Sequence, residues 1–303
     1  GLLLMYFVYR LPYAFWRSYA LPLLLLAVLL MFLVLMPGIG FFHGGARRWI
    51  VLGPISFQPA EFLKFAYVVY LAAWFESKSK SIGSFKFGLL PFLIMGAFIA
   101  SFLILQPDIG TLGVLLASVM ALFFLSGGNI KQIALLSLLC LVIISILVAI
   151  EPYRLERVKV FLNLADDPQG IGYQINQARI AVGSGGFWGR GFGFSRQKFS
   201  YLPEPMGDSI FAVMSEELGF WRVALVLGLF LALAFRGFTI ASETTDTFGK
   251  LVAGGITSWL VLQALINIAG ITGVLPLTGV PLTFISYGST SLVISLAAVG
   301  ILL

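Results

Sequence analysis

Long uninterrupted apolar runs constrain this chain more than any other feature. A helix needs about 20 apolar residues to cross a bilayer, and 59% of the 303 residues are hydrophobic whereas only 11% are charged. Soluble domains carry about 25% charged residues, and outer-membrane barrels show alternating rather than continuous apolar segments. We therefore expect an all-α, polytopic membrane protein. After a stub at 1–9, the runs are 17–37, 59–75, 88–106, 108–126, 133–150, 210–235, 249–270 and 284–303.

Residues 151–209 do not fit a membrane span, because they hold many charges and a glycine-rich stretch at 183–193. We expect one integral membrane domain over 1–303 with a large loop at 151–209, and a short amphipathic helix over 172–182 at the membrane surface. Most Lys and Arg of the short loops lie on the opposite face, so the positive-inside rule places the large loop outside the cytoplasm. The loops at 38–58, 106–108 and 271–283 share its face.

Ionisable side chains beside apolar spans are costly and by default suggest function, and here they gather on the outer face. Glu61 and Lys64 lie three apart on one helix face and can pair. Each position also has a purely structural interpretation: a paired helix end for Glu61 and Lys64, a helix cap for Asp108, and headgroup anchors for Arg47 and Arg48. Further outer-face residues are Arg196, Asp208, Glu216 and Glu217; as neighbours in sequence, at most one of the two glutamates is expected to face a cavity.

Several cations and isolated carboxylates on one face point to a phosphate-bearing ligand. Cations suit a phosphate or pyrophosphate, and a carboxylate shielded from water can act as a base. Group transfer from a lipid-linked pyrophosphate and plain anion transport both remain open at this point. The net charge of +6 is modest and no basic run has interleaved aromatics, so the sequence argues against nucleic acid as a partner.

At these residues the chain resembles the SEDS family (shape, elongation, division and sporulation), the RodA/FtsW/SpoVE-type peptidoglycan glycosyltransferases. The resemblance implies a bundle of ten transmembrane helices with a large extracellular loop. Gly1 then falls inside the second helix, and about nine helices are represented. The matching stretches, in order, are Gly44–Ile50, Gln58–Lys64, Gln106–Thr111, Gly172–Gln174, Ser184–Gly186, Leu202–Ala212, Glu216–Gly219, Asn267 and Leu275–Gly288.

The resemblance implies polymerisation of lipid II into β-1,4 glycan at the outer face of the bacterial cytoplasmic membrane. The reaction inverts the anomeric carbon, and undecaprenyl pyrophosphate leaves. Asp208 matches the family's essential aspartate, and we expect it to be the general base; a ligand role toward a divalent cation, Mg²⁺ or Mn²⁺, is the alternative. We expect the cations Arg48, Lys64, Arg196 and Arg47 to bind the pyrophosphate. The expected cavity residues are Glu61, Asp108, Glu204, Glu217 and Ser286.

The expected partners are lipid II, the nascent glycan strand, membrane lipids and a class B penicillin-binding protein with transpeptidase activity. Two other functions stay open: a lipid II flippase, and a non-catalytic scaffold for the penicillin-binding protein. The chain departs from the family pattern at two places. Gly207-Asp208-Ser209 stands where many members have Thr-Asp-Phe, and Ser289 replaces a glycine, which would matter if the backbone there had a positive φ.

Overall fold

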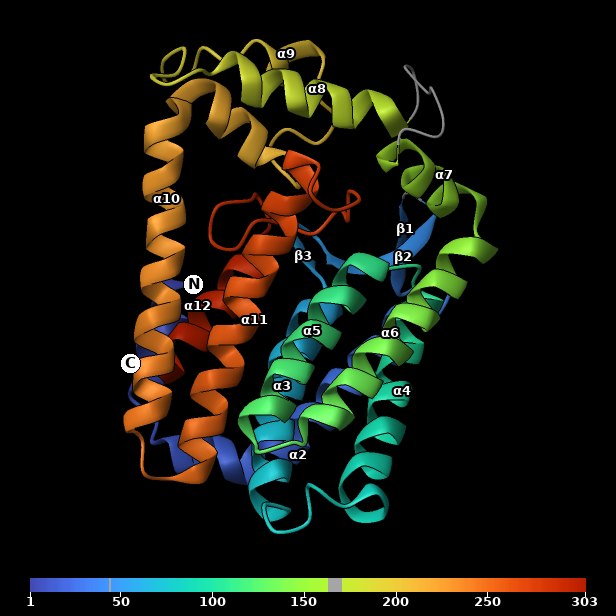
Figure 1. Cartoon of the computed structure of the whole chain (residues 1–303), viewed down its shortest axis with the longest axis vertical. Coiled ribbons are helices and arrows are strands. Elements are labelled where there is room, and N and C mark those ends of the chain that lie inside the picture. The colour runs from blue at the N-terminus through green and yellow to red at the C-terminus, as the bar shows by residue number, and fades with distance from the viewer. Residues whose placement is uncertain (44, 163–170) are drawn as a thin grey trace. The chain divides into compact units, whose positions relative to one another are not determined.

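The computed structural model describes residues 1–43, 45–162 and 171–303 (Figure 1). Their contacts group the chain into two compact units. The first unit comprises Gly1–Leu139, Ala234–Leu260 and Ser289–Leu303, and the second comprises Cys140–Leu233 and Val261–Gly288.

The structure confirms the predicted all-α class, with one small sheet. The helices are α1 Leu2–Tyr9, α2 Tyr13–Leu35, α3 Pro59–Ser77, the π-helical turn η1 Phe85–Leu89, α4 Leu90–Leu105, α5 Ile109–Leu125, α6 Ile130–Ile150, α7 Pro152–Phe161, α8 Ile171–Ser184, α9 Gln197–Ser200, α10 Ile210–Glu243, α11 Thr247–Thr272 and α12 Ser289–Leu302. The strands are β1 Gly40–His43, β2 Ala46–Leu52 and β3 Ile55–Phe57.

Among the described residues, five helical segments are long and apolar enough to cross a membrane, which confirms a multi-pass membrane protein. They are Tyr13–Leu35, Phe85–Leu105, Ile130–Ile150, Ile210–Glu243 and Thr247–Thr272, and α5 and α12 are shorter apolar helices. The run predicted at 59–75 forms α3, which is not among the five. In the first unit α3 packs against α2 and α5, and most of its residues are buried, so polar side chains can be satisfied inside the protein.

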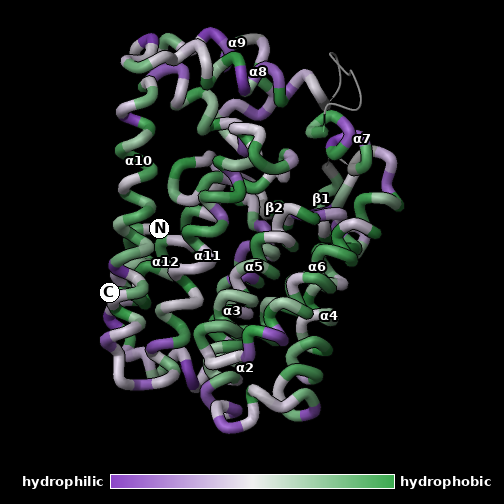
Figure 2. Tube along the Cα trace, in the orientation of Figure 1, coloured by the Kyte–Doolittle hydropathy of each residue, from purple (hydrophilic) through white to green (hydrophobic). Residues whose placement is uncertain are grey.

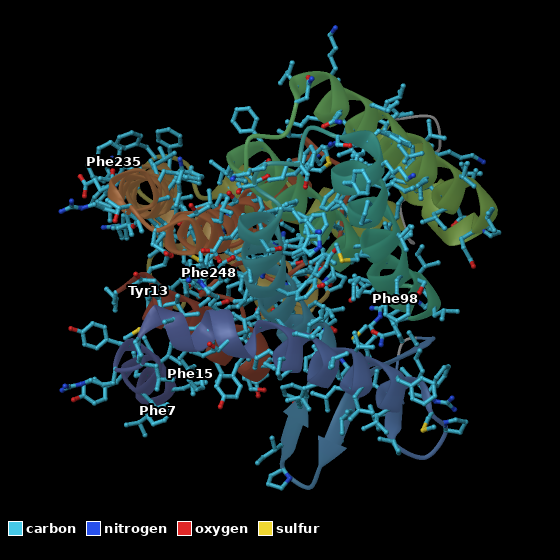
Figure 3. All side chains as sticks on the ribbon, turned by 90° about the horizontal axis from the view of Figure 1, so that it is seen from below. Phe7, Tyr13, Phe15, Phe98, Phe235 and Phe248 are labelled. Atoms are coloured by element: carbon cyan, nitrogen blue, oxygen red, sulfur yellow. The ribbon has the colours of Figure 1, made fainter. Side chains whose placement is uncertain are left out.

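The exterior of the first unit is apolar in the way that a bilayer requires. Phe7, Phe98 and Phe235 are 63%, 54% and 71% exposed, and Figure 3 shows them pointing away from their helices, whereas Phe248 is fully buried. The hydropathy-coloured trace in Figure 2 shows apolar helices with hydrophilic residues concentrated near helix ends and in connections. Lipid tails are the natural cover for such large exposed side chains.

A three-stranded antiparallel sheet occupies residues 40–57, where the sequence analysis expected only a loop. Gly40 pairs with Ile50, and Ile50 pairs with Phe57. The connection from β3 to α3 contacts the start of α12 through two hydrogen bonds. The Gln58 N–H donates to Thr290 Oγ1 at 3.1 Å, and the Ser289 hydroxyl donates to Ser56 O at 3.2 Å. Ser289 is the first residue of α12 and is not among the residues with a positive φ, so the backbone there does not require a glycine on that ground.

In the second unit the large loop folds into helices. The amphipathic helix expected over 172–182 is α8, which buries Ile175, Ala178 and Ala181 along one face, against residues of α10, α11 and the following loop. Helix α10 contains a break at Gly219, with φ 77° and ψ 175°. Only glycine adopts such a conformation readily, so the predicted span at 210–235 is split into a short first segment and a long helix that begins at Phe220.

Candidate functional site

Asp208 lies in the second unit, in the segment between α9 and α10, and its main chain is held from two sides. The side-chain amide of Asn267 on α11 donates to Asp208 O at 2.8 Å and to Val280 O at 2.7 Å. Ser286 Oγ donates to Gly207 O at 2.7 Å and accepts from the N–H of Leu282 at 2.7 Å. The predicted base and the predicted cavity residue Ser286 therefore belong to one hydrogen-bonded assembly with the loop after α11.

The environment of Asp208 raises its pKa. Burial is the main cause and the Glu204 carboxylate adds to it, whereas the charge of Arg157 and a hydrogen bond from the Ser209 hydroxyl act in the opposite direction. Ser209 Oγ lies 3.4 Å from Asp208 Oδ1 and accepts from Gln174 Nε2 at 3.2 Å. A carboxylate with a raised pKa is a stronger base than an ordinary one.

Two of the residues that depart from the family pattern, Gly207 and Ser209, are the sequence neighbours of Asp208. Ser209, where phenylalanine is usual, supplies the hydroxyl that bonds Asp208. Gly207 leaves room for Glu204, since a Cβ at 207 would lie 3.3 Å from Glu204 Oε2. Glu204 is exposed and has a φ of 47°, a left-handed conformation that non-glycine residues adopt only at an energetic cost.

Arg157 is a functional candidate that the sequence analysis missed. It lies on α7 and is half-buried, and its Nη1 donates to Leu277 O at 2.9 Å. Its charge opposes the rise in the pKa of Asp208. Pro152 at the start of the segment marks a helix, but the contact with Leu277, 120 residues later in the chain, has no local sequence signal.

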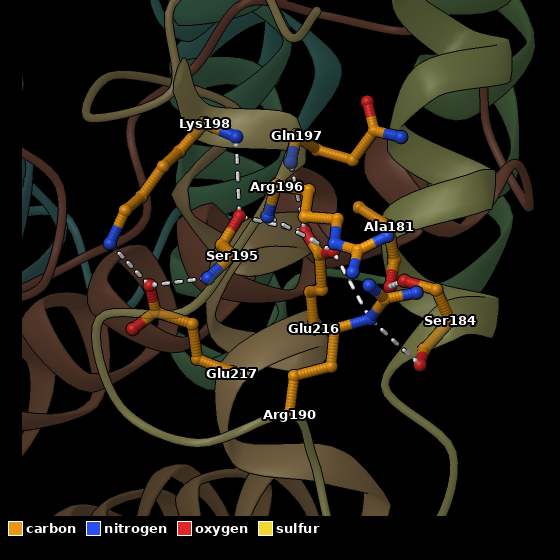
Figure 4. Close-up of polar contacts among 9 residues, drawn as sticks. All are labelled: Ala181, Ser184, Arg190, Ser195, Arg196, Gln197, Lys198, Glu216 and Glu217. Carbon is orange, nitrogen blue, oxygen red and sulfur yellow. Dashed lines mark hydrogen bonds and ion pairs between the residues drawn. The ribbon is translucent and has the colours of Figure 1, made fainter. Parts of the chain in front are cut away.

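Glu216 and Glu217 hold the segment around α9, as Figure 4 shows. Glu216 accepts from Ser195 Oγ at 2.7 Å and from the N–H groups of Arg196 and Gln197, both at 3.2 Å. Glu217, expected to line the cavity, pairs with Lys198 Nζ at 2.6 Å. The segment around α9 thus bonds both glutamates, which are 1% and 7% exposed, and the expectation that at most one of them faces a cavity stays a prediction.

The main-chain N–H of Arg196 donates to the Glu216 carboxylate, whereas the Arg196 side chain is exposed. Its head group is therefore accessible to an anion. The predicted role of Arg196 in binding pyrophosphate stays a prediction.

In the first unit Glu61 and Lys64 form the predicted pair. The Lys64 Nζ to Glu61 Oε1 distance is 2.8 Å and both side chains are 1% exposed, and the ammonium lies 5.5 Å from the centre of the Trp259 ring. The Lys64 ammonium therefore forms an ion pair with Glu61 and lies over the Trp259 ring in this conformation. Its predicted contact with substrate would need the surrounding side chains to move.

Arg48 and Asp108 each stabilise the turn between α4 and α5 with different partners. Arg48 Nε donates to Gln106 O at 3.1 Å and its Nη2 to Pro107 O at 2.7 Å. The Asp108 side chain accepts from Thr111 N and Thr111 Oγ1 at 3.1 and 2.9 Å, so the cap interpretation of Asp108 is confirmed. Arg47 is half-buried, with its guanidinium 5.9 Å from the centre of the Phe42 ring.

A divalent cation at Asp208 would find two carboxylates, its own and that of Glu204. Within the described ranges there is no group of three or more His, Cys, Asp or Glu placed to hold a metal ion. Mg²⁺ commonly binds one or two carboxylates and completes its shell with substrate phosphates and water. The residues present therefore fit a cation that arrives with a pyrophosphate substrate.

Comparison with known proteins gives one consistent result. The family model described as "Cell cycle protein", FtsW/RodA/SpoVE, matches residues 1–303. The chain is 44% identical to stage V sporulation protein E of Bacillus subtilis (strain 168), covering 100% of this chain and 83% of that protein. It is 42% identical to the probable peptidoglycan glycosyltransferase FtsW of Trichlorobacter lovleyi, covering 97% and 77%.

Solved structures agree with the sequence relatives. A chain from a peptidoglycan synthase complex, whose study concerns the coordination of polymerization and crosslinking, superposes with a TM-score of 0.81 and 30% identity, covering 100% of this chain and 84% of that one. The rod shape determining protein RodA of Thermus thermophilus superposes with a TM-score of 0.67 and 27% identity, covering 100% and 82%.

Proposed function

Because this chain belongs to the FtsW/RodA/SpoVE family of cell cycle proteins, we propose that it is a peptidoglycan glycosyltransferase that polymerises lipid II. The observation that carries the proposal is the assembly around Asp208, whose backbone is fixed by Asn267 and Ser286 and whose pKa is raised by burial. The apolar helices support a multi-pass protein. We place it in the bacterial cytoplasmic membrane, with the active face outside.

The proposed reaction joins two lipid-linked saccharides. The 4-hydroxyl oxygen of the acceptor attacks the anomeric carbon of the growing chain, its proton moves to a carboxylate oxygen of Asp208, and the bond from the anomeric carbon to the pyrophosphate oxygen breaks. Attack opposite to the leaving group inverts the carbon and gives a β-1,4 linkage. Undecaprenyl pyrophosphate leaves as an anion, so cations can take the place of a general acid.

This chain's residues divide the work between the proton and the leaving group. Arg157 and Glu204 shift the pKa of Asp208 in opposite directions, and we assign Arg157 a positioning role through its bond to Leu277 O. Arg196 has an exposed side chain for the pyrophosphate. Pyrophosphate binding by Arg48, Lys64 and Arg47 of the first unit stays a prediction from the sequence. A divalent cation held by Asp208 and Glu204 is the alternative source of positive charge.

The likeness to a chain from a peptidoglycan synthase complex supports a protein partner. We propose a class B penicillin-binding protein, a transpeptidase, which would crosslink the strand that this chain polymerises. Lipid II, the nascent strand and membrane lipids complete the set of partners.

The test is polymerisation of fluorescent lipid II by the purified chain in detergent or liposomes, with and without the transpeptidase, in Mg²⁺, Mn²⁺ or EDTA. We expect polymer from the wild type and none from Asp208→Asn, which keeps the shape of the side chain. Glu243→Gln changes an exposed carboxylate at the end of α10 and should leave polymerisation intact.

Polymerisation by Asp208→Asn at the wild-type rate would remove Asp208 as the base. No polymer from the wild type with the transpeptidase present would return the assignment to a flippase or a scaffold. Loss of polymer in EDTA with recovery in Mn²⁺ would favour the alternative in which Asp208 is a ligand of a divalent cation.

A further inference from the structure

The glycine-rich segment Gly185–Tyr201, called the aromatic loop below, is attached to the first turns of α10 by its main chain. The N–H groups of Arg190 and Gly191 donate to the carbonyl oxygens of Glu216 and Glu217 at 2.9 and 3.0 Å. The N–H of Phe220 donates to Gly186 O at 2.9 Å. These bonds join a segment outside the predicted spans to the start of the predicted span at 210–235.

Glycine is required for this close approach. Gly189 has a φ of 81°, and a Cβ there would lie 2.2 Å from Glu217 O, far inside contact distance. The carboxylates of Glu216 and Glu217 fasten the C-terminal half of the aromatic loop through Ser195 and Lys198 (Figure 4). The aromatic loop is therefore fixed at both halves, although five of its residues are glycine.

The fixed loop presents large apolar side chains outward. Phe192, Phe194 and Phe199 are 85%, 73% and 76% exposed. Phe187, Trp188 and Tyr201 on the same loop are exposed as well. Exposed apolar patches of this kind mark surfaces that bind a partner or a membrane.

The exposed aromatic surface lies next to the break in α10 at Gly219. From Phe220 to Glu243 the helix continues for about 36 Å at 1.5 Å per residue, which is enough to cross the hydrocarbon core of about 30 Å. The ring of Trp188 lies 6.3 Å from that of Trp221, and Phe187 lies 6.1 Å from Phe220. The aromatic loop therefore contacts α10 at the first turn of its membrane-crossing part, the level at which Trp and Tyr gather in membrane proteins.

The charges of this surface are complementary to lipid phosphates. The aromatic loop contains Arg190, Arg196 and Lys198 and no acidic residue. Glu216 and Glu217 pair with Arg190 and Lys198, which leaves the exposed Arg196 as positive charge. Arg222, whose guanidinium lies 4.8 Å from the Trp221 ring centre, adds a second cation at the same level. Cations next to aromatic rings are the composition of interfacial membrane-binding segments.

We propose that the aromatic loop is a rigid membrane-binding element that inserts into the headgroup region of the leaflet at the start of the long α10 segment. Phe192, Phe194 and Phe199 enter the boundary with the acyl chains, and Arg222 faces lipid phosphates. The element fixes the depth of Asp208 relative to the membrane, because only residues 202–207 separate it from that aspartate in the sequence. The occupant of the surface is the bilayer that surrounds the chain, whatever reaction the chain performs.

The test is spin-label depth measurement on the full chain in lipid nanodiscs. The single native cysteine allows a Cys140→Ala background, to which Phe192→Cys or Phe199→Cys is added. The reference positions are Leu229→Cys, exposed on the long α10 segment, and Lys80→Cys, exposed in the connection after α3. Collision with oxygen reports lipid, and collision with a water-soluble nickel chelate reports solvent.

Labels at Phe192 and Phe199 are expected to favour oxygen over the nickel chelate, between the values of Leu229 and Lys80 and closer to Leu229. Values equal to those of Lys80 would overturn the proposal. Nickel accessibility that disappears only when the transpeptidase is added would assign the surface to that protein and overturn it too. Monodisperse elution and unchanged helix content show that each variant is folded.

A second pair of variants tests rigidity. Gly189→Val forces the aromatic loop away from Glu217, so the label at Phe192 should become mobile and lose its fixed depth. Gly183→Ala, at a glycine whose added Cβ meets nothing within 4 Å, is the matched control and should leave the spectrum unchanged. An equally sharp, mobile spectrum in the parent protein and in Gly189→Val would show that the element is not rigid.

Discussion

The amide nitrogen of Asn267 lies 2.8 Å from the main-chain oxygen of Asp208 and 2.7 Å from that of Val280. One side chain on α11 thus uses both of its N–H groups to join the segment of the predicted base to the loop that follows α11. Neither carbonyl belongs to a helix or strand, so the amide replaces the hydrogen bonds that regular structure would supply.

Replacing Asn267 with Asp should lower polymerisation by about tenfold or more, because each 1.4 kcal/mol in the barrier is a factor of ten. The new carboxylate offers an acceptor where two carbonyl oxygens need donors. We expect the rate constant to fall more than lipid II affinity, since the residue positions Asp208 without touching substrate. The comparison is Gln263→Leu, a change on the same helix as Asn267 that removes the hydrogen bond from Gln263 to Pro281 O. An equal loss of rate in both variants would contradict a specific positioning role for Asn267.

Stability of the wild type and of Asp208→Asn should depend differently on pH. The pKa of Asp208 is raised above its ordinary value of 3.8, so the folded protein holds this proton more tightly than the unfolded chain does. Protonated Asp208 makes its full contribution to the free energy of unfolding below the pKa that it has in the unfolded chain. That contribution is lost as pH rises through the higher pKa of the folded protein. Asp208→Asn never ionises there, so it should be more stable than the wild type at neutral pH, and the difference should vanish in acid.

Thermal unfolding in detergent at a series of pH values measures this difference. A constant gap between Asp208→Asn and the wild type from acid to neutral pH would contradict the raised pKa. The polymerisation rate of the wild type should fall as pH drops through the same raised pKa, because the base must be ionised to accept a proton.

Arg157→Gln should shift the acid limb of the pH–rate profile to higher pH. The charge of Arg157 opposes the rise in the pKa of Asp208, so its removal lets burial and Glu204 raise that pKa further. Arg157→Lys keeps a charge and should move the limb less, even though the bond to Leu277 O is altered. Lys159→Gln, which removes an exposed cation on the same helix, should leave the limb in place. Equal shifts in Arg157→Gln and Lys159→Gln would argue for a general effect of net charge.

Lys64→Met should destabilise the protein by about 3–5 kcal/mol, because it leaves Glu61 as an unpaired buried charge. The double variant Glu61→Gln with Lys64→Met removes both charges and should recover most of the loss. Thermal unfolding of the single and double variants in detergent gives the comparison. Equal stability of Lys64→Met and the wild type would show that Glu61 finds another partner or is protonated.

The sequence by itself determined the elements whose signal is local. Continuous apolar runs give membrane helices because the hydrocarbon core leaves the backbone no other hydrogen-bonding partner, and the three-residue spacing of Glu61 and Lys64 brings them together on any helix. Asp108 directly before an apolar run predicts a helix cap, because its carboxylate can accept from an N–H group of the first turn. The expectations for α8 and for the pair in α3 held because each depends only on residues within a few turns.

Only the tertiary structure decided which distant segments meet. The contact of Arg157 with Leu277, the two bonds of Asn267, and the enclosure of both Glu216 and Glu217 by the segment around α9 join residues that sequence spacing does not relate. The sheet at 40–57 likewise depends on pairing between strands. A pKa depends on burial and on charges brought near by folding, so the sequence could nominate Asp208, but only the fold supplies the surroundings that make its carboxylate a strong base.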